Sequence, residues 1–268
     1  MLELIQITND PAFARRCDAL EGMRLFVDLE RQGKAARQAG RNTFISTHEI
    51  DDIAAIKSQL RRSRLMVRVN PLHAGTPREV DAVLEAGADM LMLPMFAGAA
   101  ELRQFAALVG GRAPVTALVE TVGALDSVDG WIATPGLAEA FVGLNDLHLA
   151  QGRRFMFEPL ADGSVQKVAE LAHRHGVAFG FGGIARLEEG LLPGRDVLAE
   201  HLRLGSGSVI LSRTFHRSDG AAPFEDEVAA LRATEAALAL RTPEQVQADS
   251  VRIAQAIRRV AAAMAEPA

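Results

Sequence analysis

The 268 residues are enough for one large α/β domain with a full hydrophobic core. The net charge is −5 and the 29 basic residues are dispersed, which argues against a nucleic-acid partner and against binding to an anionic membrane. No apolar run is long enough to span a membrane, and no signal peptide is evident. The single cysteine, Cys17, excludes an intrachain disulfide, so we expect a cytoplasmic protein.

Short apolar runs alternate with helix-like segments along most of the chain. The runs predict eight strands, over residues 2–8, 25–30, 64–70, 90–93, 115–120, 140–146, 178–183 and 208–212. This alternation predicts an α/β fold of the (β/α)8 TIM barrel type. The alternative, an open doubly wound sheet, would want a glycine-rich phosphate turn after the first strand, and Thr8-Asn9-Asp10-Pro11 is not one.

The chain continues beyond the predicted eighth strand. Residues 1–240 are expected to form the barrel domain, and residues 241–268 a C-terminal helical extension. Within the extension, Val246, Ile253, Ile257 and Val260 recur at helical spacing and form an apolar stripe. Such a stripe must cover apolar surface, either on its own barrel or on a neighbouring subunit.

Two consecutive predicted strands finish on a carboxylate, the first at Glu120 and the second at Asp146. If the strands are parallel neighbours, both side chains lie at the same C-terminal edge of the sheet. Two hard oxygen ligands on rigid strands suit a magnesium-type ion, which leaves its other positions to water and substrate. The alternative is that Glu120 starts a helix and Asp146 is a turn or N-cap residue. Their shared position favours the metal site.

Arg68 lies within an apolar predicted strand, where an unpaired guanidinium would be very costly. It should therefore be paired with anions. One possibility is a structural ion pair with Asp28 or Glu30 on the adjacent strand. The other is a planar fork that grips a substrate carboxylate, which arginine does better than lysine.

The remaining titratable residues narrow the chemistry. The chain has three lysines, and none falls at a predicted strand end near the two carboxylates, so a Schiff-base mechanism is disfavoured and a metal must activate any carbonyl. Imidazole is well poised for proton transfer near neutral pH. His48 closes a long polar tract that starts at Arg31, and His148 follows Asp146 by two residues, so either histidine could be a general base.

Several motifs together resemble the HpcH/HpaI aldolase and citrate lyase β-subunit family of the phosphoenolpyruvate/pyruvate barrel superfamily. The resemblance covers roughly residues 25–212. It rests on Val67-Arg68-Val69-Asn70, Gly87-Ala-Asp-Met-Leu-Met-Leu-Pro94-Met95, Val119-Glu120-Thr121, and Val142-Gly-Leu-Asn-Asp146-Leu followed by Gly152.

The resemblance implies that Glu120 and Asp146 bind a divalent metal, Mg²⁺ or Mn²⁺. It also implies that Arg68 holds the carboxylate and carbonyl end of pyruvate or oxaloacetate. The substrate-binding backbone implied by the resemblance is that of Gly143, Leu144 and Asn145.

The same resemblance matches Asp28-Leu29-Glu30 to an acidic strand end of the family, which makes Glu30 a candidate catalytic residue. The next position departs from the family pattern. Family aldolases carry a histidine there and the citrate lyase branch an aspartate, whereas this chain has Arg31. The base is then either moved to His48 or missing.

The first hypothesis is a metal-dependent carbon–carbon lyase, like a class II aldolase, that forms the enolate of a 2-oxo acid. The alternatives are a citrate-lyase-like enzyme acting on an acyl thioester, and a barrel that binds a carboxylate without catalysis. The family's habit of packing terminal helices between subunits further suggests a homo-oligomer, a trimer or hexamer, with the extension on a neighbour's barrel.

Overall fold

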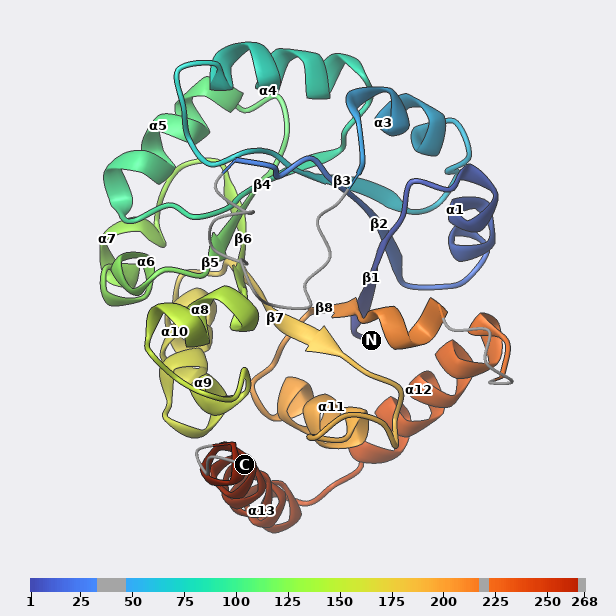
Figure 1. Ribbon diagram of the computed structural model, residues 1–268, viewed down its shortest axis with the longest axis vertical. Coiled ribbons are helices and arrows are strands. Elements are labelled where there is room, and N and C mark those ends of the chain that lie inside the picture. Colours follow the sequence, from blue (N-terminus) through green and yellow to red (C-terminus); the bar gives the residue numbers. More distant parts are fainter. Residues whose placement is uncertain (33–46, 217–221, 265–268) are drawn as a thin grey trace.

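The computed structural model describes residues 1–32, 47–216 and 222–264. Eight parallel strands form a closed barrel in the order of the sequence, as Figure 1 shows. The strands are β1 (Glu3–Ile7), β2 (Met23–Asp28), β3 (Arg64–Arg68), β4 (Met90–Leu93), β5 (Val115–Val119), β6 (Leu137–Val142), β7 (Ala178–Ile184) and β8 (Ser208–Leu211). The predicted (β/α)8 barrel is therefore confirmed.

The helices surround the barrel in a ring (Figure 1). They are α1 (Pro11–Asp18), α3 (Ile50–Lys57), α4 (Thr76–Glu85), α5 (Ala99–Val109), α6 (Val122–Asp126), α7 (Val128–Trp131), α8 (Leu144–Ala150), α9 (Glu158–Ala161), α10 (Ser164–Arg174), α11 (Gly194–Arg203), the 3₁₀ helix η1 (Arg213–His216), α12 (Phe224–Leu238) and α13 (Pro243–Ala263). Within the described ranges, none of them combines the length and apolar character that a bilayer crossing requires. Most of the predicted polar tract between residues 31 and 48 lies outside the described residues.

Several strand boundaries differ from the predicted ones, and the difference in the sixth strand concerns the site. The sixth strand ends at Val142 and not at Asp146. Gly143 caps a helix, α8, whose third residue is Asp146. A carboxylate in the first turn of a helix is favoured by the helix dipole, which explains why an acidic residue starts this helix. Between β6 and α10 the chain forms α8 and the short α9.

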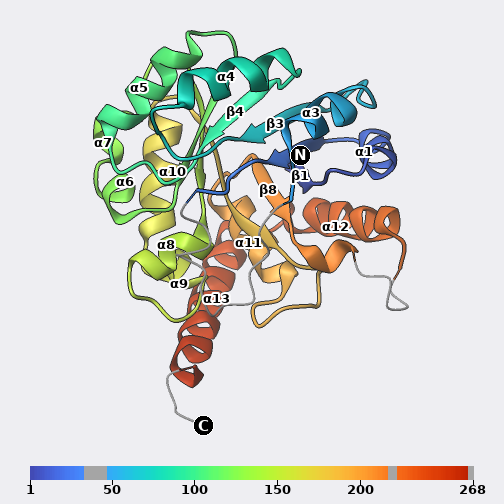
Figure 2. The same cartoon turned by 45° about the horizontal axis from the view of Figure 1, so that its top comes forward.

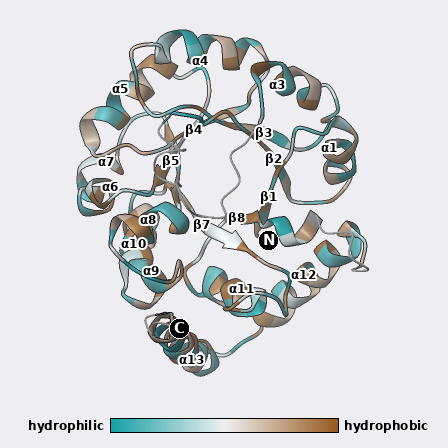
Figure 3. Ribbon diagram, viewed as in Figure 1, coloured by the Kyte–Doolittle hydropathy of each residue, from teal (hydrophilic) through white to brown (hydrophobic). Residues whose placement is uncertain are grey.

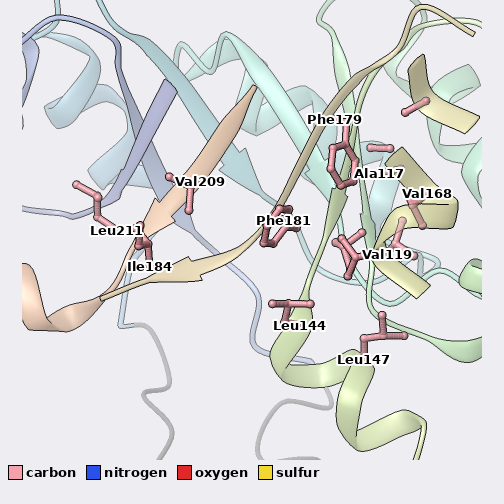
Figure 4. Close-up of a cluster of buried hydrophobic side chains, with 14 of the residues drawn as sticks. Ala117, Val119, Leu144, Leu147, Val168, Phe179, Phe181, Ile184, Val209 and Leu211 are labelled. Carbon is pink, nitrogen blue, oxygen red and sulfur yellow. The ribbon is translucent and has the colours of Figure 1, made fainter. Parts of the chain in front are cut away.

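The apolar core has two parts, one outside the strands and one inside the barrel. The outer part lies between the strands and the helix ring; Figure 4 shows a section of it, with side chains from β5, β7, β8, α8 and α10. The helices carry both polar and apolar residues along their length (Figure 3). The inner part is formed by alternate strand residues that point inward: Ile5, Phe26, Met66, Met90, Met92, Leu118 and Phe141, with Ile7 and Ile210 packed against them.

A buried polar network fills the barrel interior at its N-terminal end. Arg24 donates to Glu139 (Nη1 to Oε2, 2.6 Å) and also pairs with Glu3. Thr116 and Ser208 donate their hydroxyls to the two oxygens of the same Glu139 carboxylate, at 3.1 and 2.6 Å. Glu139 has a partner for each carboxylate oxygen, which holds its geometry firmly, whereas the buried Nε of Arg24 makes no hydrogen bond with the described residues. These side chains close this end of the barrel, which leaves the C-terminal end for a ligand.

The C-terminal helix α13 packs on its own barrel, against α9 and α11, and Figure 2 shows it lying along that side of the ring. Two residues of the predicted stripe, Ile253 and Ile257, are buried, as is the nearby Ala261, whereas Val246 and Val260 are half-buried. The sequence left open whether this stripe covers its own barrel or a neighbour's, and we expected a neighbour's. The structure shows that the stripe packs on α9 and α11 of its own chain, so it does not require a neighbouring subunit. A homo-oligomer stays a prediction, now without this support.

We predict that Ile257→Ala lowers the free energy of unfolding by about 2–4 kcal/mol, because it leaves a cavity beneath a fully buried helix position. The matched control is Val251→Ala on the same helix, where the side chain is 47% exposed and the expected change is below about 0.5 kcal/mol. Urea unfolding monitored by circular dichroism measures both. Equal losses in the two variants would contradict the packing described here.

Candidate active site

A hollow of about 230 Å³ opens at the C-terminal end of the barrel. Its floor is the top of the inner apolar core, and polar side chains stand on its rim. The apolar lining comprises Phe26, Met92, Leu118, Phe141, Leu144, Met156 and Ile210; the polar lining comprises Arg68, Glu120, Asn145 and Asp146, with Gly143, Gly182 and Gly183 between them. The structure thus brings together the two predicted metal ligands, the predicted arginine and the predicted backbone segment.

Glu120 follows β5 directly and is 2% exposed. The backbone N–H of Met95 donates to its Oε1 at 3.0 Å. Burial raises the pKa of Glu120 to about 8; Arg68 opposes this shift, while Glu30 and Asp146 add to it. A carboxylate is therefore held in a place where its negative charge is poorly compensated.

Sequence reasoning missed the part played by Met95. This residue follows β4 and has a φ of 56°, the left-handed region that a residue with a side chain rarely occupies. Such a conformation costs on the order of 1–2 kcal/mol. It turns the Met95 amide toward Glu120, and the local sequence around Pro94-Met95 does not predict this turn.

Gly143 allows the backbone of the next loop to approach Glu120 closely. A Cβ atom at this position would lie 3.0 Å from Glu120 Oε2 and 3.1 Å from a side-chain carbon of Leu118. A glycine here therefore lets α8 begin beside the carboxylate. The first backbone N–H groups of a helix have no partner within it, so those of Leu144 and Asn145 suit an anionic ligand group.

Arg68 at the end of β3 forms the ion pair that the sequence left open. Its Nε and Nη2 donate to the two carboxylate oxygens of Asp28 at 2.8 Å each, and its Nη1 lies 3.3 Å from Glu30 Oε2. Burial disfavours the charge on the guanidinium, but Asp28, Glu30 and Glu120 outweigh it and raise the pKa of Arg68. Asp28 takes the edge formed by Nε and Nη2, so a ligand would meet the end formed by Nη1 and Nη2.

The two predicted catalytic partners lie in different places. Glu30 is 1% exposed and contacts Arg68, although it is not among the residues that line the hollow. His48 is also buried, and its Nδ1 accepts the backbone N–H of Asp28 at 3.0 Å. In the neutral ring the proton is then on Nε2. His48 lines a separate hollow, together with Arg31 and Asn70.

The other candidate base is held within its own helix. His148 is buried in α8, and its Nδ1 lies 3.1 Å from the carbonyl oxygen of Leu144, one turn earlier. It is not among the residues that line the hollow. The structure therefore gives His148 a role in packing α8.

The donor set around the hollow fits a hard divalent cation. Among the described residues, no three histidine, cysteine or acidic side chains come together as a metal cluster. Magnesium and manganese need only one or two protein carboxylates, since water and substrate complete their coordination. Glu120 and Asp146 can supply these two. Burial is the main cause of the raised pKa of Glu120, and the neighbouring carboxylates of Glu30 and Asp146 add to it, so a bound cation would lower it.

Solved structures with the same fold include several lyases. An HpcH/HpaI aldolase from Desulfitobacterium hafniense DCB-2 is 15% identical with a TM-score of 0.59, over 91% of this chain and 95% of that one. A citrate lyase from Burkholderia xenovorans LB400 is 18% identical with a TM-score of 0.62, over 98% and 92%. The citrate lyase beta subunit complexed with oxaloacetate and magnesium from M. tuberculosis is 17% identical with a TM-score of 0.60, over 87% and 96%.

No curated protein matches the sequence. The family model of HpcH/HpaI aldolase/citrate lyase matches residues 7–180. This range contains β2 to β6 and the start of β7, and with them most of the strand residues that line the hollow. Because this match covers more than half of the chain, the protein belongs to the HpcH/HpaI aldolase/citrate lyase family.

Proposed function

We propose that this protein is a divalent-metal-dependent carbon–carbon lyase that acts on a 2-oxo acid of the pyruvate or oxaloacetate type. The observation that carries the proposal is the hollow lined by Glu120, Asp146 and Arg68 together. Membership of a lyase family supports it. So does the oxaloacetate and magnesium complex of the M. tuberculosis citrate lyase beta subunit.

In this proposal Glu120 and Asp146 hold Mg²⁺ or Mn²⁺. When bound, the ion supplies positive charge beside the substrate's carbonyl oxygen, which makes the neighbouring enolate easier to form. Met95 fixes one oxygen of Glu120 through its backbone N–H and thereby leaves Oε2 for the ligand side. The first-turn N–H groups of α8, from Leu144 and Asn145, receive the substrate carboxylate.

Arg68 supplies fixed positive charge that stabilises a developing enolate oxygen. Its orientation is set in advance, because Asp28 grips one edge of the guanidinium and Glu30 contacts Nη1. His48 supports this arrangement from behind by accepting the Asp28 amide. We therefore place Glu30 in the site as the partner of Arg68, and His48 outside it as a support of Asp28.

The apolar floor adds a steric property to the proposal. Phe26, Phe141 and Ile210 lie beneath the polar rim and keep water out of the barrel interior. A dry floor strengthens the electrostatic interactions of the groups above it. The proposed setting is a small-molecule enzyme of the cytoplasm, acting without nucleic acid or membrane.

We predict that Glu120→Gln and Asp146→Asn each abolish metal-dependent pyruvate release from hydroxy-oxo acids while the fold is kept. Each change removes a negative ligand without changing the shape of the side chain. Pyruvate release with manganese, read by a coupled assay, measures the effect, and circular dichroism checks the fold. A near wild-type rate in either variant would show that the metal assignment is wrong.

The same Glu120→Gln substitution that should abolish activity should raise the stability of the metal-free protein, because it removes a buried charge. Because its pKa is about 8 in the folded protein and ordinarily 4.5, the wild-type fold binds this proton more tightly than the unfolded chain and loses stability as the pH rises from 4.5 to 8. A glutamine side chain at this position would stay neutral. Without metal, Glu120→Gln should therefore be more stable than wild type by about 1–2 kcal/mol at pH 8 and equal to it at about pH 4. Urea unfolding at both pH values measures this, and a variant less stable than wild type at the higher pH would contradict it.

Arg68→Lys should also lose activity, although the positive charge is kept. An ammonium group cannot hold Asp28 with two parallel bonds and still present a second donor edge to the substrate. Titration of the manganese-loaded protein with oxalate, a mimic of the pyruvate enolate, should show affinity weakened by about tenfold or more. Wild-type oxalate affinity in this variant would show that Arg68 serves the fold alone.

A panel of hydroxy-oxo acids and acyl thioesters separates the proposed reaction from its alternatives. Pyruvate release without coenzyme A supports the proposal. Turnover only of a coenzyme A thioester would replace it with the citrate-lyase-like reaction. Silence on the whole panel with manganese, together with tight oxalate binding, would instead indicate a carboxylate-binding barrel that catalyses nothing.

A further inference from the structure

A chain of hydrogen bonds runs from α4 to the residues that follow Glu30. It begins at Glu79, whose Oε1 accepts both the backbone N–H and the side-chain Nδ2 of Asn70, at 3.0 and 2.7 Å. Asn70 stands two residues beyond Arg68. Its Oδ1 accepts the backbone N–H groups of Arg31 and Gln32, at 2.9 and 3.0 Å.

The orientation of the Asn70 amide is fixed by these partners. Its NH₂ must face the Glu79 carboxylate and its oxygen must face two backbone donors, so the opposite orientation would put donor against donor. Glu79 is held in turn by His73, whose Nε2 lies 3.1 Å from Oε2. The Nδ1 of His73 accepts the N–H of Gly75 at 3.0 Å, which places the ring proton on Nε2, facing Glu79.

We propose that Asn70, held by Glu79, is a positioning residue that keeps Glu30 beside Arg68. The segment after β2 reaches Glu30 and then meets Asn70, which fastens the two following peptide groups to the end of β3. Arg68 belongs to that same β3, so one asparagine ties together the strand that carries the arginine and the segment that carries its acidic partner. This inference rests on the proposed function, because it assigns a purpose to the geometry of Arg68.

The side chain of Arg31 fits the same picture. Its Nη2 donates to the carbonyl oxygen of His48 at 2.8 Å, while its backbone N–H is bound by Asn70. Family aldolases carry a histidine at this position. Here the position is occupied by Arg31, whose side chain binds the backbone of His48. Arginine suits this bond because its guanidinium carries only donors and the carbonyl oxygen is an acceptor.

The test compares Asn70→Ala with a matched structural control, Asp18→Ala. Asp18 accepts the backbone N–H groups of Arg61, Arg62 and Ser63, so it fastens the segment before β3 at the opposite end of the barrel. Both variants lose a polar side chain that holds successive backbone amides, and both should lose stability. Kinetics are measured with manganese at a temperature where both stay folded.

In Asn70→Ala, kcat/KM for pyruvate release should fall by about tenfold or more, since small losses of positioning are amplified in the rate. In Asp18→Ala it should stay within about twofold of wild type, because no group at the site moves. Hydrogen exchange should quicken at the amides of Arg31 and Gln32 only in the Asn70 variant. Equal kcat/KM in the two variants would overturn the proposal.

Glu79 supplies an independent check through a double-mutant cycle. If Glu79 acts through Asn70, then Glu79→Ala lowers kcat/KM, and adding it to Asn70→Ala causes no further loss. Glu79→Gln keeps an acceptor oxygen for Asn70 but turns its NH₂ group toward the Nε2–H of His73, so it should lose less activity than Glu79→Ala without matching wild type. Additive losses of kcat/KM from the two alanine substitutions would show that Glu79 does not act through Asn70. A wild-type protein inactive on the whole panel would instead overturn the proposed function, which separates the two failures.

Discussion

The site depends on one electrostatic constraint, an excess of buried and half-buried carboxylates over cations at the C-terminal end of the barrel. Asp28, Glu30, Glu120 and Asp146 gather there around Arg68. Arg68 pairs fully with Asp28 and only partly with Glu30, so it cannot neutralise the far side of the cluster. Burial raises the pKa of Glu120 to about 8, and the negative charges of Glu30 and Asp146 add to this shift. A buried charge of this kind is costly, and a divalent cation is the group that would offset it.

The rest of the barrel confines the excess of carboxylates to its C-terminal end. At the N-terminal end the charge of Arg24 is paired with Glu139 and Glu3 inside the barrel. Above them the apolar interior, with Phe26 and Phe141, keeps water away from the carboxylates. Short loops then bring backbone donors to the rim. The Met95 amide holds Glu120, and α8 begins beside it because residue 143 is glycine.

The sequence predicted what periodicity and charge determine locally. The strands appeared as apolar runs because both faces of a barrel strand are buried, and the acidic ends of β2 and β5 stood out against those runs. The position of Asp146 was predicted in space but in the wrong element, since a run such as Phe141-Val-Gly-Leu can extend a strand or start a helix. The match of Glu120, Asp146 and Arg68 to the family pattern added what periodicity could not.

The remaining features depend on contacts between distant residues, which no local pattern reports. The left-handed turn at Met95 is stabilised by a carboxylate 25 residues away. His48 is separated from the hollow because its ring binds the Asp28 amide, and Asn70 acquires its purpose only from Glu79 and the peptides after Glu30. The α13 stripe shows the same limit, because spacing reveals that a helix face is covered without saying that α9 and α11 cover it.

The central claim is that Glu120 and Asp146 share one divalent cation next to Arg68. A crystal structure with manganese and oxalate tests it most directly, because the anomalous signal of manganese locates the ion independently of the protein atoms. The account predicts a single peak with carboxylate oxygens of both residues at about 2.0–2.2 Å and oxalate facing Arg68. Manganese bound elsewhere, or no manganese in this hollow at saturating concentration, would contradict it.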